Sequence, residues 1–264
     1  MAHTALLLLL ACSPFPRLHT LQLNQRPIIG ILAQETLDAD HLLYGETYIA
    51  APYVKYLESH GCRVVPVRLN LTNDEYERIF SSINGILLPG GSSNLETSAF
   101  AKAAKKFYEL ALKAFDAGDY FPIWGTCLGL QFLVVCTAGK NLLTNTDSEN
   151  IALPLNLTNA AASSKMFQKF PPDVYKALSN EPLTANFHHV SITVKAFLEN
   201  EKLRKFYSIL STNHDRKGVE FVSSMEARKS FHRFRNSQEE RAALIYNYSP
   251  RYVPTSSYIQ IYFF

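Results

Sequence analysis

The sequence predicts an α/β fold, with a mostly parallel central sheet and helices on both faces. Short apolar runs typical of buried strands alternate with segments of helical periodicity between residues 27 and 124. Two turns, one at Gly90-Gly91 and one around Cys127, directly follow such runs. Ligands of open parallel sheets bind at the carboxyl ends of the strands. We therefore expect a functional site at that edge of the sheet.

The first half of the chain supplies the expected elements in order. Strands are expected at 27–32, 63–69, 83–88 and 120–124, and helices at 48–60, 73–80 and 96–117. Pro66 favours an edge position for the second strand, because proline cannot donate a hydrogen bond to a neighbouring strand. Gly61 is expected to end the first helix, and Asn73 to cap the second.

The second half is harder to assign. Residues 142–172 are rich in turn formers and carry no clear periodicity. Beyond them we expect an extended segment at 186–194, a helix near 196–206, and a β-pair formed by 207–211 and 219–224. The C-terminal stretch 258–264 is strongly apolar and is expected to need a docking surface. A single domain spanning 26–264 is the expected organisation.

Composition restricts the class of protein. The chain has 264 residues, of which 47% are hydrophobic and 19% charged, so it can bury a sizeable core. Its net charge of +3 is too small to favour nucleic acid or an anionic membrane as a partner. No apolar run approaches the roughly 18 residues that span a bilayer.

Residues 1–25 are expected to form a signal peptide and leader. The apolar run at 5–12 has the length of a signal-peptide core, although no Lys or Arg precedes it. The alternative is a buried apolar strand. Sequons at Asn70 and Asn156 fit a secretory route, whereas the one at Asn247 is followed by proline and is less favourable.

The cysteines do not form a disulfide scaffold. Beyond the leader, only Cys62, Cys127 and Cys136 remain, so at least one is a free thiol or pairs between chains. No CxxC spacing indicates a zinc site, and we expect neither a metal nor a cofactor.

The segment Gly125-Thr126-Cys127-Leu128-Gly129 has the layout of a nucleophile turn. Flanking glycines allow a sharp strand-to-helix turn, and the following helix directs its amides and dipole at the thiol. The Leu128 amide is an expected oxyanion donor, with a second from the Gly90-Gly91 loop. The alternative is an inert buried cysteine.

The blocks LPGG and GTCLG resemble class I glutamine amidotransferase-like hydrolases. Longer stretches resemble the gamma-glutamyl hydrolase family from Arg26 to the C-terminus: YIAAPYVKYLESHG, VVPVRLNLT, SINGILLPGGS, GDYFPIWGTCLGL, EPLTANFHHVSIT and ALIYNYSPRY. The resemblance implies a lysosomal or secreted thiol hydrolase that trims γ-linked glutamates from folate polyglutamates through a thioester. It implies Cys127 as nucleophile, Gly91 with Leu128 as oxyanion site, and His188 at the substrate site. A homodimer is compatible with it.

The resemblance breaks where the family places its general base. That histidine stands in a strand ending His-Pro-Glu, and none of the eight histidines here precedes a proline. The segment after Glu226 instead resembles the region that follows the family's last long helix. We therefore expect an internal deletion near 226/227 that removes a strand, a loop and a helix, at least roughly 30 residues.

Three hypotheses remain open at this stage. The chain is an active hydrolase, with His188 or His189 as a replacement base, or an impaired form that at most binds folate polyglutamates. The third, a glutaminase subunit of an amidotransferase, is disfavoured by the leader and sequons. His232 lies in a charged segment that we expect to be a solvated helix face.

Overall fold

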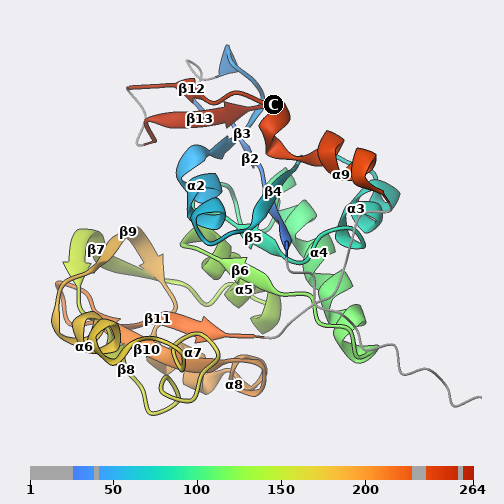
Figure 1. The fold of residues 1–264 in the computed structure, drawn as a ribbon. Helices are drawn as coiled ribbons and strands as arrows, with labels where there is room; N and C mark the ends of the chain where they lie inside the picture. Colours follow the sequence, from blue (N-terminus) through green and yellow to red (C-terminus); the bar gives the residue numbers. More distant parts are fainter. Residues whose placement is uncertain (1–25, 39–41, 228–235, 255–257) are drawn as a thin grey trace, which may run out of the picture.

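Four parallel strands form the central sheet of the computed structural model, in the order β4–β1–β5–β6 (Figure 1). They are β1 (Ile28–Leu32), β4 (Arg63–Val67), β5 (Ile86–Leu88) and β6 (Ile123–Gly125). This is the predicted parallel sheet, and β4 lies at its edge, as Pro66 indicated. The structure describes residues 26–38, 42–227, 236–254 and 258–264, so the predicted leader and His232 lie outside the described residues.

Helices cover both faces of this sheet. On one face α3 (Asn73–Phe80), α4 (Ala99–Asp116) and α5 (Leu128–Ala138) pack together through aromatic side chains, with Phe107 against Tyr76 and Phe100 against Phe132. On the other face lies α2 (Ala51–Ser59), which packs on β1 and β4 (Figure 1). Completely buried Ile, Leu and Phe side chains fill the space between the layers, which is where most of the folding free energy originates.

Two local predictions were wrong. Residues 48–50 belong to a strand, β3 (Thr47–Ala50), and the helix begins only at Ala51. Pro52 explains the boundary, because proline suits the first turn of a helix. The second helix is capped by Thr72, not Asn73, through a capping box with Glu75.

The expectation of a turn-rich segment at 142–172 was also wrong. It contains the longest strand among the described residues, β7 (Thr144–Leu153), and β8 (Asn156–Leu157). The sequence TNTDSENIAL is polar on both faces of β7, so it shows no apolar alternation. β7 pairs antiparallel with β9 (Thr184–Ser191), and this pair forms one wall of the molecule (Figure 1).

The remaining elements agree with expectation more closely. β10 (Ser208–His214) and β11 (Glu220–Glu226) form the predicted antiparallel pair. The helix expected near 196–206 is divided into α7 (Val194–Glu199) and α8 (Glu201–Phe206), and α6 (Pro172–Asn180) precedes β9.

The C-terminal region finds its docking surface within the chain. After α9 (Ser237–Ala243), the short helix η1 (Ile245–Asn247) and β12 (Arg251–Tyr252) comes β13 (Gln260–Phe263). β13 pairs with β3, which also pairs with β2 (Gln34–Glu35). Ile261 is buried as a result. The apolar end therefore completes a second, antiparallel sheet.

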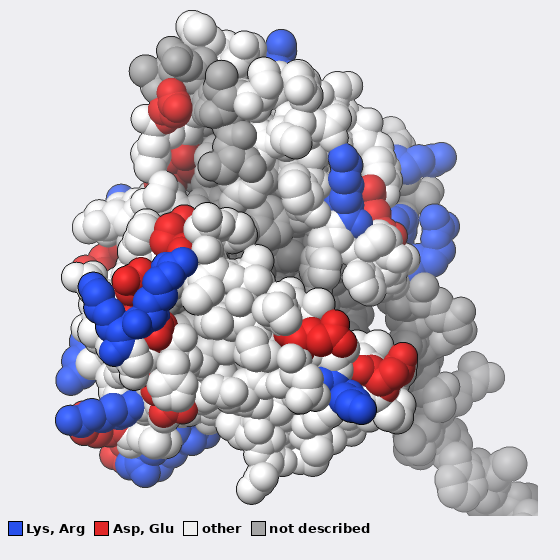
Figure 2. Space-filling model, turned by 90° about the vertical axis from the view of Figure 1, so that its left-hand side faces the viewer, with Lys and Arg blue, Asp and Glu red and all other residues white. Residues whose placement is uncertain are grey.

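The surface carries charges of both signs, interspersed with broad uncharged areas on the face that Figure 2 shows. No helix in the described part of the chain is long and apolar enough to cross a membrane. The side chains of Asn70 and Asn156 are exposed. Cys62, Cys127 and Cys136 are all free thiols in the structure.

Candidate active site

The turn at Cys127 has the predicted strand–turn–helix geometry. β6 ends at Gly125, α5 begins at Leu128, and Cys127 occupies the N-cap with φ 50° and ψ −109°. A non-glycine residue rarely adopts such a positive φ, and this strain is typical of functional sites. A Cβ atom on Gly129 would lie 2.1 Å from the Leu88 carbonyl oxygen, so the helix packs this closely on β5 only because residue 129 is glycine.

Two backbone amides contact the thiol of Cys127. Burial raises the pKa of this thiol, and the Glu149 carboxylate adds to the rise. Hydrogen bonds from the amides of Leu128 and Gly91 act against both effects and lower the pKa. The amides of the two residues expected to form an oxyanion site therefore both lie at the sulfur.

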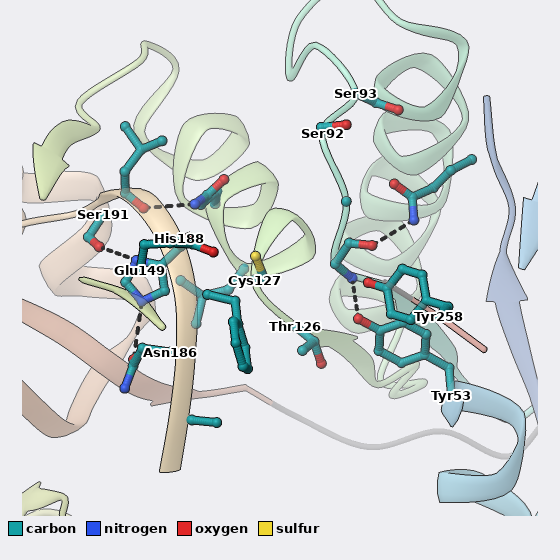
Figure 3. A pocket seen from close by; sticks show the side chains of 18 of the residues that line it. Tyr53, Ser92, Ser93, Thr126, Cys127, Glu149, Asn186, His188, Ser191 and Tyr258 are labelled. Carbon is teal, nitrogen blue, oxygen red and sulfur yellow. Dashed lines mark hydrogen bonds between the residues drawn. The ribbon is translucent and has the colours of Figure 1, made fainter. Parts of the chain in front are cut away.

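His188 lies on β9, and in Figure 3 Cys127 is seen between it and the tyrosines Tyr53 and Tyr258. Its Nδ1 is 3.0 Å from Ser191 Oγ, and its Nε2 is 3.2 Å from Asn186 Oδ1. Burial lowers the pKa of His188 and so favours the neutral form of the ring.

The hydrogen bonds of Asn186 define which nitrogen of His188 carries the proton. Asn186 Nδ2 donates to the carbonyls of Ile151 and Thr184, so its Oδ1 must be the acceptor for His188 Nε2–H. His188 Nδ1 then accepts from Ser191 Oγ. Both ring nitrogens are engaged away from Cys127, which disfavours His188 as a replacement base in this conformation.

His189 is directed to a different environment. Its Nε2 lies 3.3 Å from Glu149 Oε2 in an ion pair, and its side chain is 76% exposed. Within the described residues, neither His188 nor His189 hydrogen-bonds the Cys127 thiol.

The loop after β5 is held by two residues that sequence reasoning missed. The Gly90 N–H donates to Tyr53 Oη at 2.9 Å, and Gln34 Nε2 donates to the Gly90 carbonyl oxygen at 2.7 Å. Tyr53 comes from α2, and Gln34 comes from β2, just past the carboxyl end of β1. Polar residues at that edge of a parallel sheet are candidates by position, so Gln34 could have been found from the sequence.

One cavity of about 1070 Å³ lies between the central sheet and the β7–β9 and β10–β11 pairs, and it is lined by Gln34, Tyr53, Cys127 and His188. Among the described residues, the cavity is lined by three carboxylates, Glu35, Asp38 and Glu149, and by no Lys or Arg. Gln131 also lines it and joins α5 to β9, donating to the Val190 carbonyl at 2.8 Å. No cluster of His, Cys, Asp and Glu able to hold a metal occurs in the described ranges.

A protein-family model described as Peptidase C26 matches residues 27–232. The chain belongs to the peptidase C26 family. The chain is similar to the gamma-glutamyl hydrolases of Homo sapiens and Bos taurus, with sequence identities of 46% and 45%. Each alignment covers 91% of this chain and 90% of the relative. The gamma-glutamyl hydrolase of Rattus norvegicus is 47% identical over 91% of this chain and 77% of the relative.

A more distant relative is gamma-glutamyl hydrolase B of Dictyostelium discoideum, 34% identical over 92% of this peptidase C26 chain and 84% of the relative. Among solved structures, the glutaminase domain of a Trypanosoma brucei CTPS superposes on 76% of this chain, using 80% of its own residues. The TM-score is 0.47 and the sequence identity is 16%, so this likeness is remote.

Three of the four residues predicted for the site, Gly91, Cys127 and His188, line the cavity of this peptidase C26 member. The amide of the fourth, Leu128, hydrogen-bonds the Cys127 thiol from the first turn of α5. Glu149 was missed because its strand, β7, was not recognised.

Proposed function

We propose that the chain is a thiol hydrolase of the gamma-glutamyl hydrolase type, acting on γ-glutamyl bonds of folate polyglutamates. The observation that carries this proposal is the strained Cys127 with two amides at its sulfur, in a cavity large enough for a small molecule. The names of its relatives give the γ-glutamyl bond as the bond that is cleaved, and folate polyglutamates are the substrates that the family resemblance implies.

In the proposed reaction Cys127 Sγ attacks the γ-carbonyl carbon, and the carbonyl oxygen becomes an oxyanion facing the amides of Leu128 and Gly91. The C–N bond then breaks, and the leaving amine takes up a proton as the thioester forms. Water hydrolyses the thioester and releases the γ-carboxylate. Both proton transfers need a general acid–base group.

A second candidate, an impaired form that binds without turnover, is favoured by the engaged nitrogens of His188. An unperturbed thiol is ionised in only about one molecule in 3,000 at pH 5, and burial of Cys127 reduces that fraction further. A helix N-terminus supplies only about 0.3–1 kcal/mol toward the thiolate. Without a base, we expect turnover to fall by several orders of magnitude.

The relatives support the proposed internal deletion as its cause. The human relative aligns over 287 positions with 91% of this chain, which is about 240 of its 264 residues. Roughly 47 aligned positions therefore have no residue here. The alignment with the rat relative is shorter, at 246 positions, and it covers only 77% of that relative, compared with 90% of the human one. If most of these positions form a single gap, its size fits a missing strand, loop and helix.

The test is release of glutamate from pteroyl-pentaglutamate by the purified chain between about pH 4.5 and 8, beside a Cys127→Ala control. If the chain is an active hydrolase, glutamate is released and the control releases none. If a folded chain releases none but binds pteroyl-pentaglutamate by calorimetry, the binding form is correct. Release that persists in Cys127→Ala would contradict both candidates.

A further inference from the structure

The peptide between Gly90 and Gly91 is held on one side by Gln34 and faces Cys127 on the other. Gln34 Nε2 donates to the Gly90 carbonyl oxygen at 2.7 Å, and the N–H of Gly91 hydrogen-bonds the thiol. A trans peptide is planar, so its C=O and N–H point in opposite directions. The single hydrogen bond from Gln34 therefore also sets the direction of the Gly91 N–H.

This peptide needs such a restraint because glycines stand on both sides of it. Glycine has no Cβ and reaches most of the conformational map, so rotation of the whole peptide unit meets little steric resistance. A rotated peptide would turn the Gly90 carbonyl toward Cys127, where it would repel a thiolate or an oxyanion.

The hydrogen bond from Gln34 makes rotation of this peptide energetically unfavourable. Its side chain is 2% exposed, and its Oε1 has no hydrogen-bond partner among the described residues. Rotation of the peptide would remove the acceptor of Nε2 as well, leaving the whole buried amide unpaired. Tyr53 Oη fixes the preceding peptide by accepting from the Gly90 N–H at 2.9 Å.

The identity of Gly91 is explained by the same contact. A Cβ atom at this position would lie 1.6 Å from Gln34 Oε1 and 2.6 Å from Gln34 Cδ. A side chain at residue 91 would displace Gln34, so the glycine and the glutamine fit only as a pair.

We propose that Gln34 is a positioning residue that holds the Gly90–Gly91 peptide with its N–H directed at Cys127. It thereby builds one half of the oxyanion site. This use in catalysis rests on the proposed function, whereas the restraint on the thiol environment does not.

The test replaces Gln34 by Met, which has a similar shape and cannot donate. Alkylation of Cys127 by iodoacetamide is followed against pH, with peptide mass spectrometry to separate Cys127 from the other cysteines of the chain. We expect the midpoint of thiol ionisation to rise by about one pH unit or more, the usual effect of losing a hydrogen bond to an ionised group. Glu149, Tyr53 and Tyr258 also face the thiol, and none of them is changed.

Asn84→Leu is the matched control. Asn84 is a second buried amide, 7% exposed, and its Oδ1 accepts from the Ile28 N–H at 2.9 Å at the opposite end of β5 from Gly90. This variant is expected to lose stability without moving the midpoint of Cys127. If Gln34→Met does not fold, Gln34→Glu replaces it, because a protonated carboxyl donates to the Gly90 carbonyl and an ionised one cannot. Its alkylation rate relative to wild type should then fall as pH rises.

An unchanged midpoint in a folded Gln34→Met protein, or a pH-independent rate ratio in Gln34→Glu, would overturn the proposal. Where wild type turns over pteroyl-pentaglutamate, Gln34→Met should lower kcat at least tenfold and change KM less than about twofold, the pattern of an interaction made in the transition state. A shifted midpoint in a chain that never releases glutamate would support the restraint while the proposed function fails.

Discussion

At the scale of single residues, the site combines one strained nucleophile with polar groups that are already paired. Cys127 has a positive φ, two amides at its sulfur, and a pKa raised by burial. Burial favours the neutral form of His188, and both its ring nitrogens are hydrogen-bonded to neighbours on its own strand. The two amides at the sulfur can therefore stabilise negative charge at Cys127.

The half-buried His188 gives a prediction about stability in acid. Its folded pKa lies below the unfolded value of about 6.5, so the unfolded state binds the proton more readily. The stabilising contribution is full above that value and is lost as pH falls through it toward the lower folded pKa. His188→Gln should therefore lose less free energy of unfolding than wild type between pH 7 and 5. We expect a difference below about 1 kcal/mol, because solvent screens the partly exposed ring.

Urea unfolding at several pH values measures this difference. His189→Gln is the control, since it removes a histidine from the adjacent, exposed position of the same strand. Parallel stability curves for wild type and His188→Gln would show that His188 does not titrate in the predicted direction.

At the scale of elements, β6 is the least protected strand of the central sheet. In the described part of the chain it pairs only with β5, and its outer edge has no partner. Trp124 on this strand is 44% exposed and lies beside Tyr56 of α2, which is 45% exposed, with ring centroids 6.5 Å apart. An unpaired edge next to exposed aromatic rings favours association between chains.

Trp124→Lys should reduce that association, because an edge lysine is costly to bury between strands. Sedimentation velocity over a range of concentrations should show a smaller fraction of oligomer than in wild type. Leu43→Lys is the matched control, since it changes an apolar side chain that is 85% exposed but lies outside the described strands. Equal oligomer fractions in wild type and Trp124→Lys would rule out the β6 edge as the contact.

The elements also show what the sequence could and could not predict. β1, β4 and the Cys127 turn were found because buried parallel strands are continuous apolar runs and the turn requires glycines. β7 was missed because its side chains are polar on both faces and its partner, β9, is about 40 residues away. Gln34 was missed for a related reason, since its partner Gly90 is 56 residues away in sequence.

At the scale of the whole molecule, the central sheet retains the nucleophile but ends at the strand that carries it. A strand added beside β6 would lie next to Cys127 and cover the exposed edge. The proposed deletion near 226/227 would remove such a strand and leave this edge of the sheet unpaired. The chain after residue 236 folds back onto β3 through β13, so such a deletion would leave the docking of the last segment intact.

A chimera tests this account directly. If the proposed deletion is correct, insertion between Glu226 and Ala227 of the human segment that has no counterpart here, at most roughly 47 residues, should supply a general base and pair β6. We expect glutamate release from pteroyl-pentaglutamate to rise by at least about 100-fold, the lower range for general acid–base catalysis. The same chimera with Cys127→Ala should remain inactive. A folded chimera without a gain in rate would show that the segment does not carry the missing function.

The hydrogen bond between Trp124 and Thr126 has an optical consequence. Trp124 is the only tryptophan of the chain, its indole N–H donates to Thr126 Oγ1 at 3.1 Å, and Thr126 lines the cavity beside Cys127. A molecule that contacts Thr126 changes the polarity around a single fluorophore. The emission spectrum of the unlabelled protein can therefore report occupancy of the cavity, and it does so whether or not the bound molecule is ever cleaved.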